Sequence, residues 1–327
     1  MKFIHHVEGG LPESLTISET PIPELKANHV LVKVAYFGIN RADTLQRQGK
    51  YPAPANESKI LGLEVSGEVV AIHDTQVKSV NFNIGDKVFG LVAGGGYAEY
   101  VLVNTEHLMG VPSNISLAEA AGIAECFLTA YQALFLESQL LEQQKVLIHA
   151  GASGVGLAAI QLAKAHDCAV ATTASSTDKL ALCQKLGADL LINYKEQDFL
   201  TEVKNRWSGC DLVVDFIGGD YLNRNLKLLN QDGAILYLAM LAGRYADKLD
   251  MALLLGKRAS IKGSTLRNRS DAYKSQLVQK FSDHYLDCFS KGTLTSIIDT
   301  EYSVADVSKT HQRMENNDTK GKLVVSW

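Results

Sequence analysis

The stretch KVLIHAGASGVG, residues 145–156, joins an apolar run of strand character to a turn that contains three glycines. Without side chains at Gly151, Gly154 and Gly156, the backbone can turn tightly and approach a pyrophosphate, which then lies at the N-terminus of the next helix. A helical pattern follows directly, over residues 155–166. This order of strand, glycine turn and helix predicts a dinucleotide-binding turn, against the alternative of a glycine-rich turn that binds nothing.

Beyond this turn, apolar runs of strand character alternate regularly with helical patterns. Such alternation indicates βαβ units and a parallel sheet, and right-handed crossovers then place helices on both faces. Six strands fit a doubly wound, Rossmann-type sheet of the α/β class. The strands are expected at residues 145–150, 169–174, 189–194, 211–217, 234–239 and 260–265, and the first helices at residues 155–166, 177–186 and 197–207.

The first third of the chain differs, because all six prolines lie at or before Pro112 and short β-branched runs are separated by Gly, Asn and Asp. This pattern predicts a second, β-rich domain, and we expect the tail to pack on it because the tail does not extend the βαβ series. The β-rich strands are expected at residues 29–35, 64–72, 87–92 and 98–103, and the tail elements at 272–289, 301–304 and 321–325. The expected domains are residues 1–123 with 266–327, and residues 124–265.

The composition excludes several classes of protein. A net charge of −4 and a pI of about 6.1, without a long Lys/Arg run, argue against nucleic-acid binding. The N-terminus lacks the apolar segment of a secretory signal, and no continuous apolar run of about 20 residues is present to span a membrane. Five scattered cysteines without a CxxC pair indicate free thiols, so we expect a cytoplasmic protein.

The end of the second expected strand indicates which dinucleotide is bound. A site specific for NAD has an acidic residue there, about 20 residues past the glycines, to bind the ribose 2′-hydroxyl. Residues 174–179 read ASSTDK instead. The hydroxyls of Ser175 and Ser176 with the charge of Lys179 suit a 2′-phosphate, so the sequence favours NADPH over NADH. Either serine can also cap the following helix, and both roles can hold together.

The usual signs of a catalytic metal are missing. Dehydrogenases with this two-domain plan often hold a zinc ion with cysteine and histidine, but Asn40 and Leu63 stand where two of those ligands are placed. Cys126 has no evident partner ligands, so we interpret it as a small residue packed near the nicotinamide side. Hydride delivery to an acceptor that needs little activation, such as a quinone or an electron-poor alkene, is then the simplest chemistry.

Taken together, the motifs resemble the zinc-free quinone oxidoreductase branch of the medium-chain dehydrogenase/reductase superfamily, nearly from end to end. No single motif is specific, but the combination is. The resemblance implies a β-rich, GroES-like catalytic domain beside an NADPH-binding Rossmann domain, and a homodimer that joins two sheets edge to edge. It rests on residues 40–43, 46–52, 60–64, 94–101, 128–131, 148–150, 161–164, 185–189, 192–194 and 264–269.

The same resemblance implies where the cofactor binds. Its pyrophosphate would lie on the glycine turn, its 2′-phosphate at the end of the second strand, and its nicotinamide end against Thr129. One departure is that this sequence has Ser175-Ser176 where relatives often have Gly-Ser, which leaves open which hydroxyl meets the phosphate. The implied residues are Gly151, Gly154, Val155 and Gly156 for the pyrophosphate, Ser176, Lys179 and Tyr194 for the 2′-phosphate, Thr129, Met240 and Leu266 for the nicotinamide end, and Asn317 closing over the cofactor.

The resemblance also implies that Asn40, Asp43 and Tyr51 line the acceptor pocket. Each residue type has an alternative role: Asp43 can cap a helix that starts near Thr44, and Tyr51, which precedes a proline, can be packing on an extended loop. Asn317 likewise suits an ordinary polar turn. In our hypothesis Asn40 and Tyr51 shape the site and Asp43 orients them or a water molecule.

The resulting hypothesis is a metal-independent NADPH:quinone oxidoreductase, with the quinone in the interdomain cleft. No residue stands out as a general acid, so solvent is the expected source of protons. The first alternative is an NADPH-dependent alkenal or 2-enoyl reductase on the same scaffold. The second is a non-catalytic NADPH-binding sensor or structural protein. Cys126, which relatives commonly lack, leaves inhibition by thiol reagents as an open question.

Overall fold

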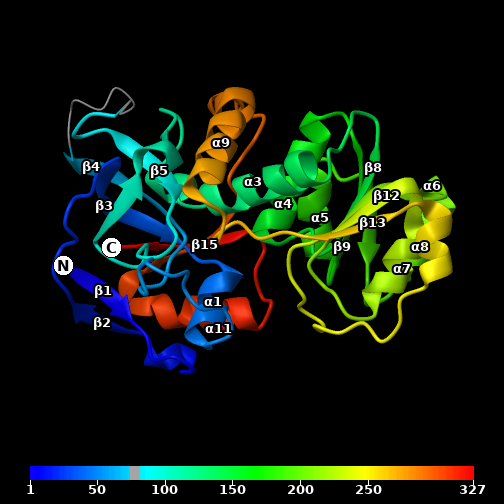
Figure 1. Ribbon diagram of the computed structural model, residues 1–327, viewed down its shortest axis with the longest axis horizontal. Helices are drawn as coiled ribbons and strands as arrows, with labels where there is room; N and C mark the ends of the chain where they lie inside the picture. The colour runs from blue at the N-terminus through cyan, green and yellow to red at the C-terminus, as the bar shows by residue number, and fades with distance from the viewer. Residues whose placement is uncertain (74–81) are drawn as a thin grey trace. The chain divides into compact units, whose positions relative to one another are not determined.

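A computed structural model describes residues 1–73 and 82–327 (Figure 1). The chain folds as two compact units, the first made of Met1–Leu128 and Leu266–Trp327, the second of Thr129–Thr265. The division at residue 123 that the sequence suggested lies five residues earlier than this one. The helix α3 (Ala124–Tyr131) begins in the first unit and ends in the second, so no break in regular structure marks the boundary.

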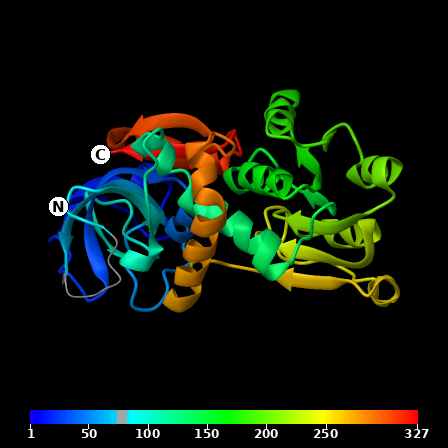
Figure 2. The ribbon, with the colours of Figure 1, turned by 90° about the horizontal axis from the view of Figure 1, so that it is seen from above.

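The second unit contains a six-stranded sheet in which every neighbouring pair is parallel, in the order β10-β9-β8-β11-β12-β13. This is the order of a doubly wound dinucleotide-binding sheet, so the predicted Rossmann fold is confirmed. In Figure 2 the yellow strand β13 forms one edge of this sheet. The strands are β8 (Lys145–Ile148), β9 (Ala169–Ala174), β10 (Leu190–Asn193), β11 (Cys210–Asp215), β12 (Leu229–Tyr237) and β13 (Ser260–Gly263).

Helices connect these strands and cover the sheet. The apolar faces of α6 and α7 pack against the sheet through Phe199, Val203 and Leu226, all of which are buried. The strand order reverses between β8 and β11, which makes the carboxyl ends of these strands the place where a ligand binds in folds of this kind. The helices are α4 (Gly154–Ala165), α5 (Thr177–Lys185), α6 (Phe199–Trp207), α7 (Tyr221–Leu228) and α8 (Met251–Lys257), preceded by the π-helical turn Gln132–Glu137.

The first unit is built on a sheet in the order β14-β15-β3-β4-β5-β7, with β6 paired to β3. The tail strand β15 pairs with β3 antiparallel, so the prediction that the tail packs on the β-rich domain is confirmed. A separate hairpin joins β1 to β2. The strands are β1 (Lys2–His5), β2 (Thr16–Glu19), β3 (His29–Gly38), β4 (Glu64–Ile72), β5 (Lys87–Leu91), β6 (Tyr100–Asn104), β7 (Leu108–Gly110), β14 (Ile298–Ser303) and β15 (Lys322–Ser326).

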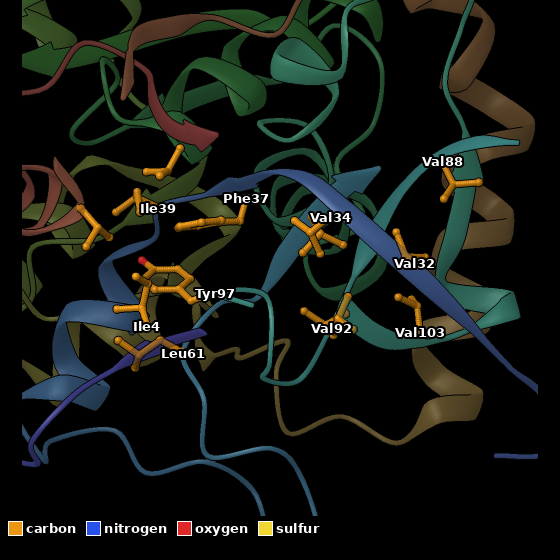
Figure 3. Packing of buried hydrophobic residues seen from close by; sticks show 14 of the residues in the cluster. Ile4, Val32, Val34, Phe37, Ile39, Leu61, Val88, Val92, Tyr97 and Val103 are labelled. Atoms are coloured by element: carbon orange, nitrogen blue, oxygen red, sulfur yellow. The ribbon is translucent and has the colours of Figure 1, made fainter. Parts of the chain in front are cut away.

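The core of the first unit gathers side chains from β1, β3, β5 and β6, among others (Figure 3). Phe37 and Tyr97 pack with their ring centroids 4.3 Å apart, and Ile4 and Leu61 are wholly buried in the same cluster. The expected tail helix is interrupted, because α9 (Asp271–Phe281) passes through a π-helical turn, Ser282–Leu286, into α10 (Asp287–Ser290). The other helices are α1 (Arg41–Arg47), α2 (Leu117–Ala120) and α11 (Val307–Glu315), with short 3-10 turns at Pro12–Ser14, Thr105–His107 and Val304–Asp306.

Across the described ranges, every helix is too short or too polar to reach from one side of a lipid bilayer to the other.

Candidate cofactor and active site

The glycine turn connects β8 to α4 and leaves no room for side chains at two positions. A Cβ atom on Gly151 would lie 1.8 Å from Oγ1 of Thr172, and one on Gly156 would lie 2.5 Å from the carbonyl oxygen of Ala150. Ser153 caps α4 by accepting the N–H of Gly156. The turn is therefore packed tightly against Thr172 of β9. Gly154 and Val155 are the first two residues of α4, as the sequence predicted.

The residues expected at the 2′-phosphate lie at the same edge of the sheet. Asn193 pairs with Ala174 in the parallel register of β10 and β9, so Ser175 and Tyr194 each follow directly beyond the paired ends of their strands. The phenol of Tyr194 is 45% exposed. No acidic residue lies between β9 and Ser176 at this edge.

Ser176 caps the next helix, which was one of the two roles predicted for it. Its Oγ accepts the N–H of Lys179 at 3.4 Å, and α5 begins at the following residue. A serine hydroxyl that accepts one hydrogen bond still has a proton to donate. The capping role is therefore compatible with donation to a phosphate, and Ser175 adds a second, half-buried hydroxyl beside it.

The end of the sheet near the expected nicotinamide is organised by a buried carboxylate. Asp215, at the end of β11, accepts the N–H groups of Ile217 at 2.5 Å and Gly218 at 3.1 Å and the amide of Asn225 at 2.7 Å. These bonds fix the loop that follows β11. Met240, past the end of β12, is 60% exposed.

Thr129 has a buried hydroxyl oxygen that lacks a hydrogen-bond partner within residues 1–73 and 82–327. Buried hydroxyls without partners are uncommon and costly, so this one suits a polar ligand group such as a carboxamide. With the closely packed glycine turn, this orphaned oxygen shows that the second unit fits a nicotinamide dinucleotide. The groups that would hold it are the N-terminus of α4, the hydroxyls after β9 and Thr129.

Two further cofactor residues predicted from the resemblance belong to the first unit. Leu266 is 5% exposed. Asn317 follows α11 in a left-handed conformation, with φ of 56°, and its Oδ1 accepts a hydrogen bond from Arg41 at 2.6 Å. Asn317 therefore does end a helix in a polar turn, and its role toward the cofactor stays a prediction.

A buried ion pair lies at the centre of the first unit, and the sequence analysis missed it. Lys322 donates to Glu64 at 2.5 Å and to the amide oxygen of Asn40 at 2.8 Å, and the amide nitrogen of Asn40 donates to Glu64 at 3.0 Å. Glu64 is 0% and Lys322 4% exposed. A signal was present, because each is a charged residue at the first position of a mainly apolar strand.

Asp43 occupies a different position from the one that its capping alternative assigned. The helix α1 begins at Arg41 rather than near Thr44, and Asp43 is its third residue. The carboxylate accepts the N–H of Asn40 at 2.7 Å and the N–H of Gly62 at 3.1 Å. Burial raises the pKa of Asp43 to about 6, against the opposing effect of these bonds. Asp43 is fully buried and holds the segments of Asn40 and Gly62 together, and its role in the acceptor pocket stays a prediction.

The first unit contains a pocket, whose lining includes Leu63, Val92, Glu125, Leu266 and Arg267. Arg267 donates through Nε to the carbonyl oxygen of Ala93 at 2.7 Å. The guanidinium carbon of Arg267 lies 5.7 Å from the ring centroid of Tyr51, a distance within the range of a cation–π contact. Tyr51 therefore lies beside a residue of this pocket, which is consistent with an acceptor role that remains a prediction.

The donor set at the position of the zinc ligands is apolar or already occupied. Leu63 is 2% exposed, and the amide of Asn40 is held between Glu64 and Lys322. Within the described ranges, the His, Cys, Asp and Glu side chains form no group of three suited to a metal ion. Cys126 is 3% exposed, and burial raises the pKa of its thiol to about 12.

The burial of the thiols predicts their order of alkylation. Burial also raises the pKa of Cys168 to about 11 and that of Cys183 and Cys210 to about 12, whereas Cys288 is only half-buried. The thiolate is the reactive form. With iodoacetamide at neutral pH, Cys288 should be modified first. Mass spectrometry of peptides measures the rate at which each cysteine is modified. All five should react in urea, and labelling of native Cys126 as fast as Cys288 would contradict this.

Comparisons with known proteins agree with this architecture. Residues 26–113 match the alcohol dehydrogenase GroES-like domain, and residues 154–283 match the family described as zinc-binding dehydrogenase. The fold, the glycine turn and these two matches define a member of the medium-chain dehydrogenase/reductase superfamily.

Curated relatives narrow this class. The chain is 28% identical to the quinone oxidoreductase of Mus musculus, over 99% of this chain and 97% of that protein. It is 30% identical to the quinone oxidoreductase-like protein 2 homolog of Nematostella vectensis, over 92% of this chain and 82% of that protein. The chain belongs to the quinone oxidoreductase family of this superfamily, and it is an oxidoreductase.

Solved structures with the same fold differ in cofactor and reaction. A mycobacterial protein complexed with NADPH has a TM-score of 0.89 and 26% identity, covering 100% of both chains. An NAD-dependent alcohol dehydrogenase has a TM-score of 0.87 and 28% identity, also covering 100% of both. The enoyl reductase CurK has a TM-score of 0.86 and 25% identity, covering 99% of this chain and 98% of that chain.

Proposed function

We propose that this protein is an NADPH-dependent quinone reductase that needs no metal ion. The observation that carries the choice of cofactor is the end of β9, where Ser175 and Ser176 follow the strand in place of an acidic residue, with Lys179 and Tyr194 close by in sequence to the ends of β9 and β10. The relatives named quinone oxidoreductase support the choice of acceptor. When bound, the dinucleotide supplies a hydride from C4 of its nicotinamide.

The residues of the chain bind and orient the reactants in this proposal. The glycine turn brings the N–H groups at the start of α4 to the pyrophosphate, and the hydroxyl of Thr129 meets the carboxamide. In the first unit Asp43 holds the loops of Asn40 and Gly62, and Tyr51 forms part of the acceptor surface beside Arg267.

Independence from zinc is part of the proposal and rests on the charge already present. The ammonium group of Lys322 lies between Glu64 and Asn40, where a cationic metal would meet repulsion from it. A buried leucine at position 63 offers no ligand atom. The acceptor must therefore be activated by organic groups of the chain.

The direct test is NADPH oxidation by the purified, chelator-treated protein with 1,2- and 1,4-quinones, and with NADH as the parallel donor. We expect turnover with NADPH that survives chelation and is much weaker with NADH. Equal rates with NADH would overturn the choice of cofactor. Loss of turnover on chelation would overturn metal independence. Absence of turnover with every quinone would overturn the choice of acceptor.

Replacement of Lys179 by glutamine should raise the KM for NADPH by roughly 10-fold or more while leaving that for NADH within about 2-fold. A charge-assisted hydrogen bond to the 2′-phosphate contributes on the order of 1.5–3 kcal/mol, and 1.4 kcal/mol corresponds to a factor of ten. Lys185→Gln, in the exposed last turn of α5, is the matched control. Equal changes with both donors would show that Lys179 does not bind the 2′-phosphate.

A second candidate function is reduction of an enone or enoyl thioester, favoured by the similarity to the enoyl reductase CurK. A comparison of kcat/KM for quinones, alkenals and enoyl thioesters separates the two. A clear preference for a thioester would replace the quinone assignment. Tight NADPH binding without turnover of any acceptor would favour a non-catalytic, NADPH-binding protein.

A homodimer through β13 is also proposed. This strand is the last in its sheet, and Ile261 on it is 36% exposed. The neighbouring α8 buries none of its residues, and its Met251 and Leu255 are 56% and 72% exposed. An exposed edge strand beside apolar side chains suits pairing with a second copy. Light scattering should give twice the chain mass, and Ile261→Lys should give a monomer.

The five unpaired cysteines support a reducing, cytoplasmic location.

A further inference from the structure

Arg267 is a buried cation whose hydrogen-bonding groups are mostly unused. Its side chain lines the pocket of the first unit, and the residue is 5% exposed. Nε donates to Ala93, but Nη1 and Nη2 are buried and have no hydrogen-bond partner in the described part of the chain. Leaving buried charged donors without acceptors is costly, so this arrangement indicates a ligand oxygen as the missing partner.

The residues around Arg267 include negative charges, but they accept no hydrogen bond from its Nη1 and Nη2 groups. Burial lowers its pKa, while the charges of Asp43, Tyr51, Glu125 and Glu57 raise it. Arginine nevertheless stays protonated in proteins. The two carboxylate oxygens of Asp43 are used by backbone N–H groups, and Tyr51 presents its ring. The pocket therefore offers a permanent positive charge with free N–H groups.

Glu125 lies on the wall of the same pocket. It is the second residue of α3, and its backbone N–H donates to Glu64 at 2.9 Å. Within the described ranges its carboxyl group makes no hydrogen bond. Burial raises the pKa of Glu125 to about 8, and Glu64 and Asp43 add to this, while Lys322 and Arg267 oppose it. At neutral pH the carboxyl group is thus mainly a neutral acid, next to the permanent cation.

Other titratable groups face this acid. Tyr51 interacts with it electrostatically, and the adjacent Cys126 carries a thiol whose pKa is raised to about 12 by burial. Glu57 lines the same pocket, but its side chain is exposed. Tyr51 and Cys126 keep their protons through the neutral range, because the pKa of each is raised above its ordinary value. His107 also lines the pocket, but burial lowers its pKa, so at neutral pH its imidazole is mainly without a proton to give. Glu125 is therefore suited to give up a proton in this pocket.

We propose that Arg267 and Glu125 bind and protonate the acceptor oxygen that becomes negatively charged during reduction. This inference rests on the proposed function and adds two catalytic residues to it. The quinone takes up a hydride, with its two electrons, and becomes a hydroquinone monoanion. The N–H groups of Arg267 bind the anionic oxygen. The O–H bond of Glu125 breaks, its proton forms the second hydroquinone O–H bond, and water later returns a proton to the carboxylate.

The oxyanion site is tested by binding, without turnover or cofactor. The full-length protein is titrated with 4-nitrophenol, whose phenolate has its own absorption band. Arg267 should favour the bound phenolate, so that ionisation of the bound phenol occurs at lower pH than in water. Arg267→Met should weaken phenolate binding at least 10-fold, and Arg267→Lys should weaken it less. Arg269→Met, which removes a nearby charge outside the pocket lining, should bind as the wild type does.

Thermal unfolding of each variant establishes that it is folded before binding is compared. The oxyanion site is refuted if the folded wild type binds no phenolate, or if Arg267→Met and Arg269→Met bind equally well. Retained affinity in Arg267→Lys together with loss in Arg267→Met supports a requirement for positive charge at this position.

The proton donor is tested by the pH dependence of kcat with a quinone. In the wild type, kcat should fall as the pH rises through about 8, because Glu125 loses the proton that it must donate. Glu125→Gln should lower kcat about 100-fold, the lower range for loss of a general acid, and should abolish this fall. Glu68→Gln, an exposed carboxyl on β4 outside the pocket lining, is the control and should keep the wild-type profile. An unchanged rate and profile in Glu125→Gln refutes the assignment.

The two tests separate this inference from the proposed function. Phenolate binding that depends on Arg267, without any quinone turnover, would retain the oxyanion site and reject the quinone. NADPH-dependent quinone turnover that is indifferent to Arg267 and Glu125 would retain the function and reject this inference.

Discussion

Replacement of Lys322 by methionine is expected to destabilise the first unit by about 3–5 kcal/mol, the range for breaking a buried ion pair by removing one partner. Glu64, which is 0% exposed, would keep a buried carboxylate with only the amide of Asn40 and the N–H of Glu125 as donors. The loss of charge would also release the amide oxygen of Asn40. We therefore expect the stability of the first unit and the position of the Asn40 side chain to change together.

The measurement is urea unfolding followed by tryptophan fluorescence. The two tryptophans lie in different units, Trp207 in the second and Trp327 in the first, so a Trp207→Phe background isolates the first unit. The double variant Glu64→Gln/Lys322→Met should recover part of the loss, because no unpaired charge remains. Lys309→Met, which breaks an exposed pair with Asp306, is the control and should cost below about 1 kcal/mol. Equal losses in both lysine variants would contradict the buried-pair argument.

Replacement of Gly156 by alanine should weaken NADPH binding by about 100-fold or more. The added methyl group would lie 2.5 Å and 2.7 Å from the carbonyl oxygens of Ala150 and Gly151, so the glycine turn must open to admit it. Opening the turn displaces the N–H groups at the start of α4 from the pyrophosphate, since the glycines serve close helix–strand packing and close approach of the ligand. Calorimetric titration with NADPH measures the change.

Gly256→Ala is the matched control. Gly256 lies in α8 of the same unit, and a Cβ atom there would meet nothing within 4 Å. Alanine in an open helical position should leave NADPH binding unchanged and raise stability by up to about 1 kcal/mol. NADPH affinity preserved in Gly156→Ala would show that the cofactor does not use this turn.

The alternation of strands and helices was sufficient to predict the second unit because four of its five strand pairs join strands that follow one another along the chain. The glycine turn of residues 145–156 follows its strand and precedes its helix in every such unit, so position along the chain and position in space coincide. The capping role of Ser176 could be predicted for the same reason.

The centre of the first unit could not be predicted in this way. Glu64 and Lys322 are far apart in the sequence and meet only because β15 adds to β3 beside β4. Arg267 and Glu125 come from opposite sides of the second unit in sequence, and no periodicity marks that they line one pocket. The pattern around Asp43 indicated a cap but misplaced the helix start by three residues, because the capping residue is Asn40.

The C-terminal strand β15 leaves the ribosome last, and this order determines which unit can complete its fold first. The second unit is continuous, Thr129–Thr265, and has all of its strands available while the tail is still being made. The first unit must wait for β15, because Lys322 on it neutralises Glu64. During synthesis the second unit can therefore fold first, while the sheet of the first unit stays open along β3. A stop codon just before Gly321 would then leave a folded second unit and a first unit without β15.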